Sequence, residues 1–159
     1  MEFELHGVKF NYEYGNIYRL YHLKKGDEWK EIKIQSDGKG YKRLQFRINK
    51  KIYQFSLHRL MYWLHNRHWD IMDSSTNNSI DHINGDKLNN NIENLRVVTQ
   101  QENNWNRTRA KGYNWDKKNK KWRANIKLND KTIYLGYFEK EEDARNAYLE
   151  AKKKYHIIR

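Results

Sequence analysis

Apolar and polar side chains alternate along much of the first third of the chain. Four segments combine aromatic and β-branched residues with this two-residue period, IYRLYHL, WKEIKIQ, YKRLQFRI and KIYQFSL. The pairs Gly26-Asp27, Asp37-Gly38 and Asn49-Lys50 favour turns between them. Residues 1–55 are therefore predicted to form a twisted antiparallel sheet.

The period then changes to that of a helix. Ser56 is a predicted N-cap, and apolar residues follow at helical spacing, at Leu57, Leu60, Met61 and Leu64. The polar stretch 65–79 is predicted to be an exposed loop. A short strand is expected over 79–83, then a turn centred on Asn84-Gly85-Asp86, and a second strand over LRVVT.

A helix is predicted to begin directly after the second strand. In Thr99-Gln100-Gln101-Glu102, the Thr hydroxyl and the Glu carboxylate can each satisfy a free backbone N–H group of the other residue. This capping box predicts a helix over 100–106. The chain thus places a strand, a strand and a helix within thirty residues.

The last fifty residues return to strict alternation. One face of WRANIKL carries Trp122, Ala124, Ile126 and Leu128, and the other carries Arg123, Asn125 and Lys127. Asn129-Asp130 predicts a hairpin turn, and TIYLGYF returns with Ile133 and Leu135 inward. A closing helix has the apolar stripe Ala144, Ala147, Tyr148, Ala151 and Tyr155. We expect a three-stranded sheet packed on one helix, and an α+β fold for the whole chain.

The charge distribution indicates a polyanionic partner. The net charge is +12, with +5 on residues 1–57, zero on 58–109 and +7 on 110–159. The neutral middle is kept neutral by carboxylates, which a plain DNA-coating protein does not need. Aromatic side chains among Lys and Arg suit nucleic-acid surfaces, although most of the rings are expected to fill the cores of small domains.

Composition and the chain's first residues narrow the compartment and the chemistry. The absence of cysteine removes disulfides, thiol chemistry and cysteine-ligated zinc. The N-terminus lacks the pattern of a signal peptide, and no stretch is long and apolar enough for a membrane span. We expect a cytoplasmic protein of a bacterial or phage-infected cell, with no membrane partner and no small-molecule substrate.

The neutral middle holds the residues needed to cut a phosphodiester bond. A histidine such as His82 can deprotonate water near neutral pH. A hard divalent cation on oxygen ligands neutralises charge on the phosphate and on the departing oxygen. Asp81 and Asn103 offer a carboxylate and an amide oxygen, leaving most of the shell for water and DNA. Each of these residues taken alone is typical of an ordinary protein surface, and only their combination indicates a site.

The spacing of these residues, 12 positions from His82 to Asn94 and 9 from Asn94 to Asn103, resembles the HNH or ββα-metal endonucleases. The resemblance is to the phage and intron-homing branch, in which the last His is replaced by Asn. It implies that Asp81 and Asn103 bind Mg²⁺ or Mn²⁺, that His82 is the general base, and that Asn94 braces the loop orienting His82. Asp81 and His82 are strand neighbours, so they converge only if the strand ends or kinks there.

The roles of the other histidines are less clearly indicated by the sequence. His58 precedes Arg59 on the amphipathic helix and either touches phosphate, as the resemblance weakly implies, or has a structural role. His65 and His68 have metal-like spacing, but without nearby carboxylates they are interpreted as solvated.

The segment from Gly112-Tyr113 to Tyr155 resembles the APETALA/ethylene-response-factor type of DNA-binding domain. The matching features are WRANI, LGYF and the helix containing Glu142-Asp143-Ala144. In that family a three-stranded sheet lies in the major groove. The alternative, a solvated lysine face, is disfavoured by the excess of basic residues. The predicted DNA-contacting residues are Arg59, Arg96, Arg107, Arg109, Lys111, Asn114, Lys117, Lys118, Lys120, Arg123, Asn125, Lys127, Thr132 and Tyr134.

These observations predict three parts: a β-rich DNA-contacting region (1–55), an HNH nuclease core (56–107) and a DNA-binding domain (108–159). The predicted activity is site-specific hydrolysis of double-stranded DNA by a homing or free-standing phage enzyme. A restriction, repair or defence nuclease is possible within the same class. The alternative from another class is a DNA-binding regulator with a catalytically silent HNH scaffold.

Overall fold

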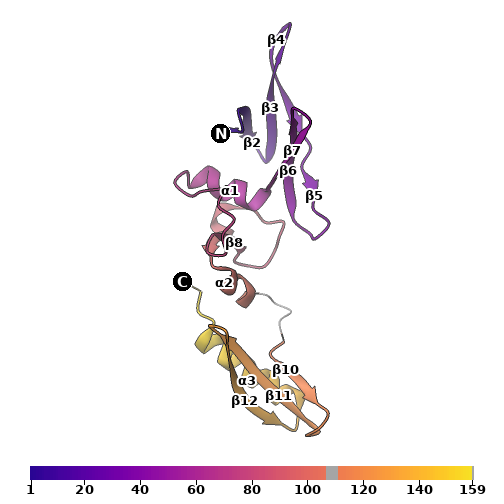
Figure 1. Cartoon of the computed structure of the whole chain (residues 1–159), viewed down its shortest axis with the longest axis vertical. Helices are drawn as coiled ribbons and strands as arrows, with labels where there is room; N and C mark the ends of the chain where they lie inside the picture. Colours follow the sequence, from indigo (N-terminus) through magenta and orange to yellow (C-terminus); the bar gives the residue numbers. More distant parts are fainter. Residues whose placement is uncertain (107–110, 159) are drawn as a thin grey trace. The chain divides into compact units, whose positions relative to one another are not determined.

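A computed structural model describes residues 1–106 and 111–158 of the chain (Figure 1). These residues form two compact units, Met1–Val97 and Val98–Arg159, which are described separately below. Sheets and helices both contribute to each unit, as expected for an α+β protein.

The first unit begins with two antiparallel sheets where one was predicted. β1 (Glu2–Leu5), β2 (Val8–Glu13), β3 (Asn16–Leu23) and β4 (Gly26–Ile32) form the first sheet in that order. β5 (Gln35–Ser36), β6 (Lys42–Ile48) and β7 (Lys51–Ser56) form the second. The single-sheet prediction was wrong because a sheet with one apolar face needs another layer to cover it. Each sheet supplies that layer for the other, and the ring centroids of Phe10 and Phe46 lie 4.8 Å apart.

The turns were predicted with uneven accuracy. Asn49 and Lys50 both have positive φ (46° and 69°), the conformation of a two-residue hairpin turn whose twist matches its strands. That predicted turn is confirmed. The predicted turn at Gly26-Asp27 is misplaced, because Gly26 already begins β4 and pairs with Leu23.

One hydrophobic core joins these sheets to the elements that follow. α1 (Leu57–His65) has Ser56 at its N-cap and buries Leu60, Met61 and Leu64, as the helical spacing predicted. The core also takes in side chains from the sheets and from the central strands, including Phe46, Phe55, Ile80 and Leu95. The predicted DNA-contacting region and nuclease core therefore share one packed interior in the first unit.

The predicted strand, strand and helix are confirmed as secondary structure. β8 (Ser79–His82) pairs with β9 (Leu95–Val98), a 3₁₀ turn η1 (Ile92–Asn94) precedes β9, and α2 spans Gln100–Trp105. The capping box is present, with the Glu102 backbone N–H donating to Thr99 Oγ1 and the Thr99 N–H donating to the Glu102 carboxylate.

The second unit contains the predicted sheet and helix. β10 (Tyr113–Asp116), β11 (Lys121–Leu128) and β12 (Lys131–Phe138) pair antiparallel in sequence order, and α3 (Glu141–Tyr155) packs on them. Ile126, Tyr148 and Ala151 form the core. The predicted hairpin at Asn129-Asp130 is confirmed by two positive φ values, 47° and 61°.

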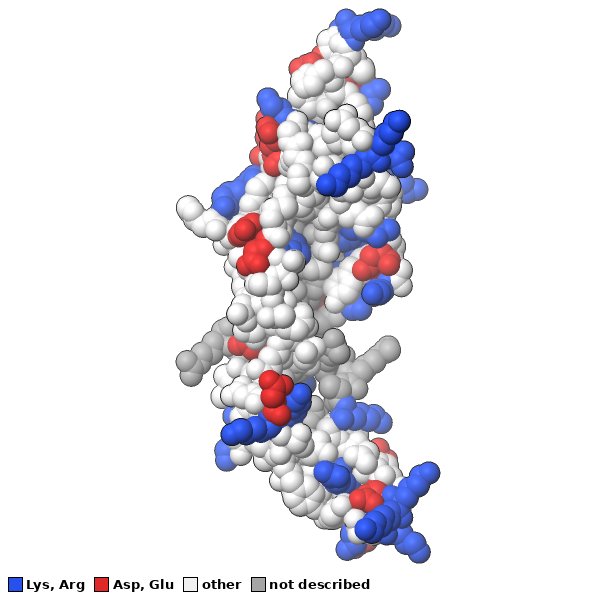
Figure 2. Space-filling view, viewed as in Figure 1, with Lys and Arg blue, Asp and Glu red and all other residues white. Residues whose placement is uncertain are grey.

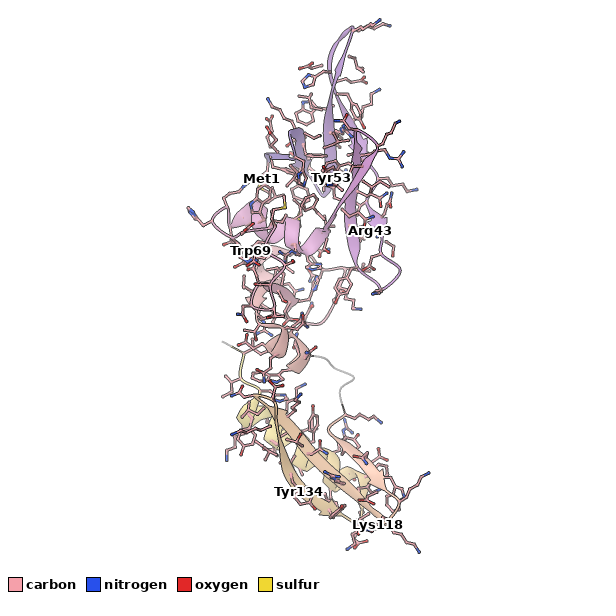
Figure 3. All side chains as sticks on the ribbon, viewed as in Figure 1. Met1, Arg43, Tyr53, Trp69, Lys118 and Tyr134 are labelled. Atoms are coloured by element: carbon pink, nitrogen blue, oxygen red, sulfur yellow. The ribbon has the colours of Figure 1, made fainter. Side chains whose placement is uncertain are left out.

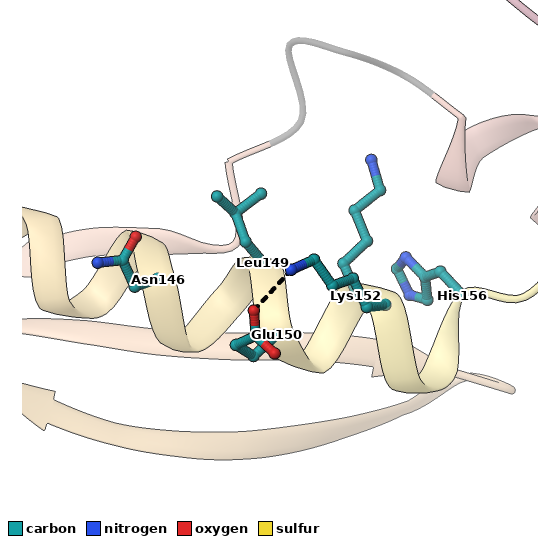
Figure 4. A pocket seen from close by; sticks show the side chains of 6 residues that line it. Asn146, Leu149, Glu150, Lys152 and His156 are labelled. Carbon is teal, nitrogen blue, oxygen red and sulfur yellow. Dashed lines mark hydrogen bonds and ion pairs between the residues drawn. The ribbon is translucent and has the colours of Figure 1, made fainter.

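Two further contacts tie α2 and the chain end into the second unit. The rings of Trp105 and His156 stack with centroids 4.6 Å apart, and His156 Nε2 donates to the Lys127 carbonyl. Beside α3 lies a hollow of about 460 Å³ whose wall includes the ion pair of Lys153 and Glu150 (Figure 4). None of the predicted site residues that the structure describes lines this hollow. Among the described residues, no helix has the length and apolar character needed to cross a bilayer.

Gly112 provides a test of packing in the second unit. A Cβ at this position would overlap the ring of Tyr148 and the carbonyl oxygen of Asn125. We expect Gly112→Ala to lower the unfolding free energy of this unit by about 1–3 kcal/mol, as overpacking does. Thermal and denaturant unfolding followed by circular dichroism would measure the change. Lys111→Ala, at the exposed neighbouring position, is the control, and equal stability of both variants would contradict the packing.

Candidate active site

Asp81 and His82 lie buried at the end of β8, where the two residues are 6% and 4% exposed. The strand stops at His82, whose carbonyl accepts the Gly85 N–H in a tight turn. Asp81 and His82 were expected to converge only if the strand ends or kinks at this point, and the strand does end there. Burial on both faces of so short a strand means that both polar side chains need partners within the protein.

One partner of the His82 ring is a residue that the sequence reasoning missed. Nε2 of His82 lies 3.1 Å from Oδ1 of Asn90. The Asn90 amide nitrogen donates to the Leu88 carbonyl, so the amide oxygen must face the imidazole. Nε2 is therefore the donor, and Nδ1 carries the lone pair in the neutral ring. Asn90 stands in a run of three asparagines, and spacing alone does not distinguish one of them.

Asn94 joins the two ends of the loop that carries this contact. Its backbone carbonyl accepts the Ile83 N–H, and its Oδ1 accepts the Asn84 N–H at 3.1 Å. Its amide nitrogen donates to the Asn89 carbonyl at 2.8 Å. These three bonds hold residues 83–84 and 89 together, which is the arrangement that a bracing role requires. The part that Asn94 plays in catalysis stays a prediction.

Asp81 is paired with Arg96 from the neighbouring strand β9. Both Nε and Nη2 of Arg96 donate to Oδ2 of Asp81, at 3.2 and 3.0 Å. The buried carboxylate thus gains a charged partner, without which its burial would be strongly unfavourable. Arg96 was predicted to contact DNA, and that contact stays a prediction beside the observed ion pair.

A second histidine packs against the first. The ring of His58 lies 5.2 Å from the ring of His82, and Tyr41 contacts both, at 5.3 and 5.9 Å. Burial lowers the pKa of His58 to about 4, assisted by the charges of His82 and Arg59 and opposed by Asp37. A ring that is neutral at physiological pH is a weak partner for phosphate. Of the two interpretations of His58, the structural one is therefore favoured.

Arg59 holds the loop after α1. Its guanidinium donates to the backbone carbonyls of Asn78, Ile71 and Asp73 at 2.6–2.9 Å and lies over the Trp69 ring. The stretch predicted as an exposed loop is therefore pinned at several points, and Ile71 is buried in the core. The DNA contact predicted for Arg59 stays a prediction, with most of its donors already bound to carbonyls.

Asn103 lies in the first turn of α2, within the second unit, and its N–H donates to the Thr99 carbonyl. Among the described residues, no cluster of three or more His, Asp or Glu side chains could hold a metal. The ligands predicted from the sequence are the Asp81 carboxylate, in the first unit, and the Asn103 amide oxygen, in the second. Both are hard oxygen ligands of the kind that Mg²⁺ takes while keeping several waters. Metal binding by either residue stays a prediction.

The residues predicted to contact DNA in the second unit are mostly exposed. Asn125 pairs with Tyr134 and Lys127 with Thr132 across β11 and β12, on the face opposite Ile126 and Ile133. Arg123 and Asn114 pair across β10 and β11, while Lys111 precedes β10 and Lys117, Lys118 and Lys120 lie at the following turn. Arg107 and Arg109 lie outside the described residues.

Tyr137 adds a residue to this face that sequence reasoning missed. It pairs with Arg123, and its hydroxyl donates to Asp116 at 2.8 Å. A hydrogen bond from the Asn119 backbone, with those from the Tyr137 and Asn119 side chains, lowers the pKa of Asp116 to about 2. The bulge between Ala124 and Asn125 shifts the alternation along β12, so a strict two-residue count from Tyr134 would have placed Tyr137 inward.

The His58 pKa predicts how stability responds to acid. Between pH 6.5 and 4 the unfolded chain binds a proton at His58 that the folded protein excludes. This residue therefore reduces the unfolding free energy as pH falls through that window, by at most about 1.4 kcal/mol per pH unit. We expect His58→Gln to lose less stability than the wild type between pH 6.5 and 4 in denaturant titrations. Parallel pH profiles would contradict a buried neutral His58.

The tautomer of His82 can be observed directly. We expect ¹⁵N NMR of the wild type at neutral pH to show the proton of the neutral ring on Nε2. Asn90→Ala removes the acceptor and should give a mixture of tautomers, with the fold unchanged by circular dichroism. Asn91→Ala, one position along, is the control. A wild-type ring protonated at Nδ1 would contradict the assigned Asn90 amide orientation.

Comparisons with known proteins bear on the segment that contains these residues. Residues 75–105 match a family model described as HNH endonuclease. The chain is also 37% identical to Protein 3.8 of Escherichia phage T7 over 54 residues. That match covers 30% of this chain and 45% of Protein 3.8, so the chain spans less than half of that relative. No solved structure matches the chain.

The matched segment contains Asp81, His82, Asn94 and Asn103 and ends at Trp105, the last residue of α2. The match supports a nuclease-type function with a nucleic-acid partner. HNH nucleases generally use a divalent metal. Residues 75–105 are thus similar to an HNH endonuclease domain.

Proposed function

We propose that the protein is a site-specific endonuclease that hydrolyses phosphodiester bonds of double-stranded DNA, as a homing or free-standing phage enzyme. The observation that carries the proposal is the fixed imidazole of His82, buried beside Asp81 inside the segment similar to HNH endonucleases. The products would carry 5′-phosphate and 3′-hydroxyl ends.

His82 is the general base in this proposal. Asn90 accepts a hydrogen bond from Nε2, so the lone pair of the neutral ring lies on Nδ1, and Nδ1 is the nitrogen that would take a proton from water. His58 and Tyr41 pack on the ring from the side and limit its rotation. Asn94 keeps the loop that carries Asn90 closed against the end of β8.

Asp81 and Asn103 would hold one divalent cation, Mg²⁺ or Mn²⁺. Such a cation neutralises charge on the phosphate and stabilises the departing 3′ oxygen. Arg96 orients the Asp81 carboxylate by two hydrogen bonds to one of its oxygens.

Recognition of the DNA is assigned mainly to the outer face of β10–β12, in the manner of the APETALA/ethylene-response-factor type of domain. Exposed Arg123, Lys127 and Tyr134 support this assignment, and the guanidinium of Arg123 lies near the Tyr134 ring. The exposed lysines at 117, 118 and 120 suit phosphate contacts, which give affinity without sequence preference.

The ion pair of Asp81 and Arg96 also favours one alternative. A carboxylate already neutralised by an arginine would bind a cation less strongly, as in a regulator that binds DNA through an inactive HNH scaffold. The two possibilities differ in whether DNA is cut in the presence of metal.

Incubation of the purified protein with supercoiled plasmid separates them. We expect nicked or linear DNA with Mg²⁺ and none with EDTA. His82→Ala should reduce the rate about 10²–10⁴-fold while leaving DNA affinity nearly intact, because only proton transfer is removed. His68→Ala, an exposed histidine of the same unit, is the control. Intact plasmid at every Mg²⁺ and Mn²⁺ concentration, with retained DNA binding, would favour the regulator.

A further inference from the structure

A long stretch of the first unit contains no carboxylate. Residues 38–69 carry eight Lys or Arg side chains and no Asp or Glu. Residues 1–37, by contrast, carry six basic and seven acidic side chains. The positive charge of the first unit is therefore concentrated on the part of the chain that forms β6, β7 and α1. In Figure 2, Lys and Arg side chains flank the side of the first unit where β6 and β7 lie.

The β6–β7 hairpin has two chemically distinct faces. Leu44, Phe46 and Phe55 point into the core. The alternate positions face away from it, in the cross-strand pairs Arg43–Ser56, Gln45–Gln54 and Arg47–Ile52. We call this second set the ribbon face. Arg47, Ile52 and Gln54 are exposed, and Arg43 and Gln45 are partly exposed. Figure 3 shows the position of Arg43.

The polar side chains of the ribbon face are ordered by one another. Nη1 of Arg43 donates to Oε1 of Gln54, and Nε2 of Gln54 donates to Oε1 of Gln45, both at 3.1 Å. The chain of bonds crosses between the strands twice. Long side chains that are already held in place lose less conformational entropy when they bind a ligand. An arginine and two glutamines in such an array are also the side chains that form paired hydrogen bonds with guanine and adenine edges.

We propose that the ribbon face lies in the major groove of duplex DNA and reads bases there. A B-DNA major groove is wide enough for a two-stranded β-ribbon. Arg43, Gln45 and Gln54 would meet base edges, and the exposed Ile52 suits the methyl group of thymine. Arg47, with the lysines at the hairpin end, would meet phosphates. The inference rests on the proposed function for the identity of the polymer, and it adds a second reading surface to that of β10–β12.

The ribbon is fixed to the candidate active site within the same unit. Tyr41, the residue before β6, contacts the rings of His58 and His82. Nζ of Lys87 lies over the Tyr41 ring and donates to the Lys39 carbonyl. These two contacts join the segment before β6 to the loop after β8. A duplex seated on the ribbon would therefore have a defined position relative to His82. Base reading by the ribbon would select which phosphate reaches that histidine.

Charge and groove geometry favour duplex DNA over other partners. A-form RNA has a deep, narrow major groove that side chains cannot read. An acidic protein would be attracted to the same charge but offers no repeated edge pattern for the array of Arg43, Gln54 and Gln45.

The first test compares two charge-matched double variants for binding to duplex DNA, in a His82→Ala background that slows cutting. Arg43→Ala with Arg47→Ala removes two charges from the ribbon face. Lys24→Ala with Lys25→Ala removes two exposed charges from the β3–β4 turn. We expect the first to flatten the slope of log affinity against log salt, by about 0.9 for each lost phosphate contact, and the second to leave it unchanged. Equal effects of both, or no effect of either, would overturn the proposal.

Because Arg43 is partly buried, its replacement can disturb the fold. A single substitution at the exposed Arg47 avoids this problem. Arg47→Glu should weaken binding by at least the loss seen with Arg47→Ala, while Lys25→Glu should not, with unchanged thermal unfolding in each. Gln45→Ala with Gln54→Ala removes no charge. It should keep the salt slope and change the base preference in a selection from randomised duplexes. An unchanged preference, or equal competition by duplex RNA, would overturn base reading by this face.

The plasmid assay distinguishes failure of this inference from failure of the proposed function. If the wild type does not cut plasmid but the ribbon variants lose DNA binding relative to the Lys24/Lys25 control, DNA binding by the ribbon face is supported and the proposed nuclease activity is contradicted. If the wild type cuts plasmid and the ribbon variants bind and select DNA like that control, the nuclease activity is supported and DNA binding by the ribbon face is contradicted.

Discussion

The burial of two ionisable side chains at the end of β8 constrains the rest of the first unit. Asp81 and His82 are adjacent and almost fully covered, and neither can be buried without partners. Arg96 from β9 serves the carboxylate, and Asn90 serves the imidazole. The loop between the two strands must close to deliver Asn90, and Asn94 closes it. A short, polar and asparagine-rich segment is thereby held in one conformation by hydrogen bonds instead of by apolar packing.

This arrangement explains which features the sequence could predict. Elements with a clear period, such as β11, and elements with a chemical marker, such as the capping box before α2, were predicted within one residue. Asp81, His82, Asn94 and Asn103 stood out because their spacing resembles a known family. The sequence reasoning did not find Asn90, because a run of three asparagines has no internal signal and its middle member is selected only by the turn geometry.

Three other features could not be predicted from local sequence patterns, for a physical reason. The division of residues 1–55 into two sheets follows from which apolar faces meet, and that depends on contacts such as Phe10 with Phe46 that are distant in sequence. A bulge at Ala124 and Asn125 places Tyr137 outward, where a strict two-residue count from Tyr134 would place it inward. Arg59 was grouped with DNA contacts because of its charge, whereas the folded chain surrounds it with the carbonyls of its own loop.

The continuous core of the first unit bears on how such a protein can change in evolution. Phe46 and Phe55 pack with Leu60, Ile80 and Leu95, so the sheets and the strand bearing His82 are not independent parts. Recombination that brought in a foreign N-terminal segment at residue 55 would leave apolar side chains of α1 and β8 without matched neighbours. A join near residue 97, where the compact units divide, would leave this interior intact. The first two sheets are therefore inherited together with His82, whereas a change of the C-terminal sheet and helix would not disturb this core.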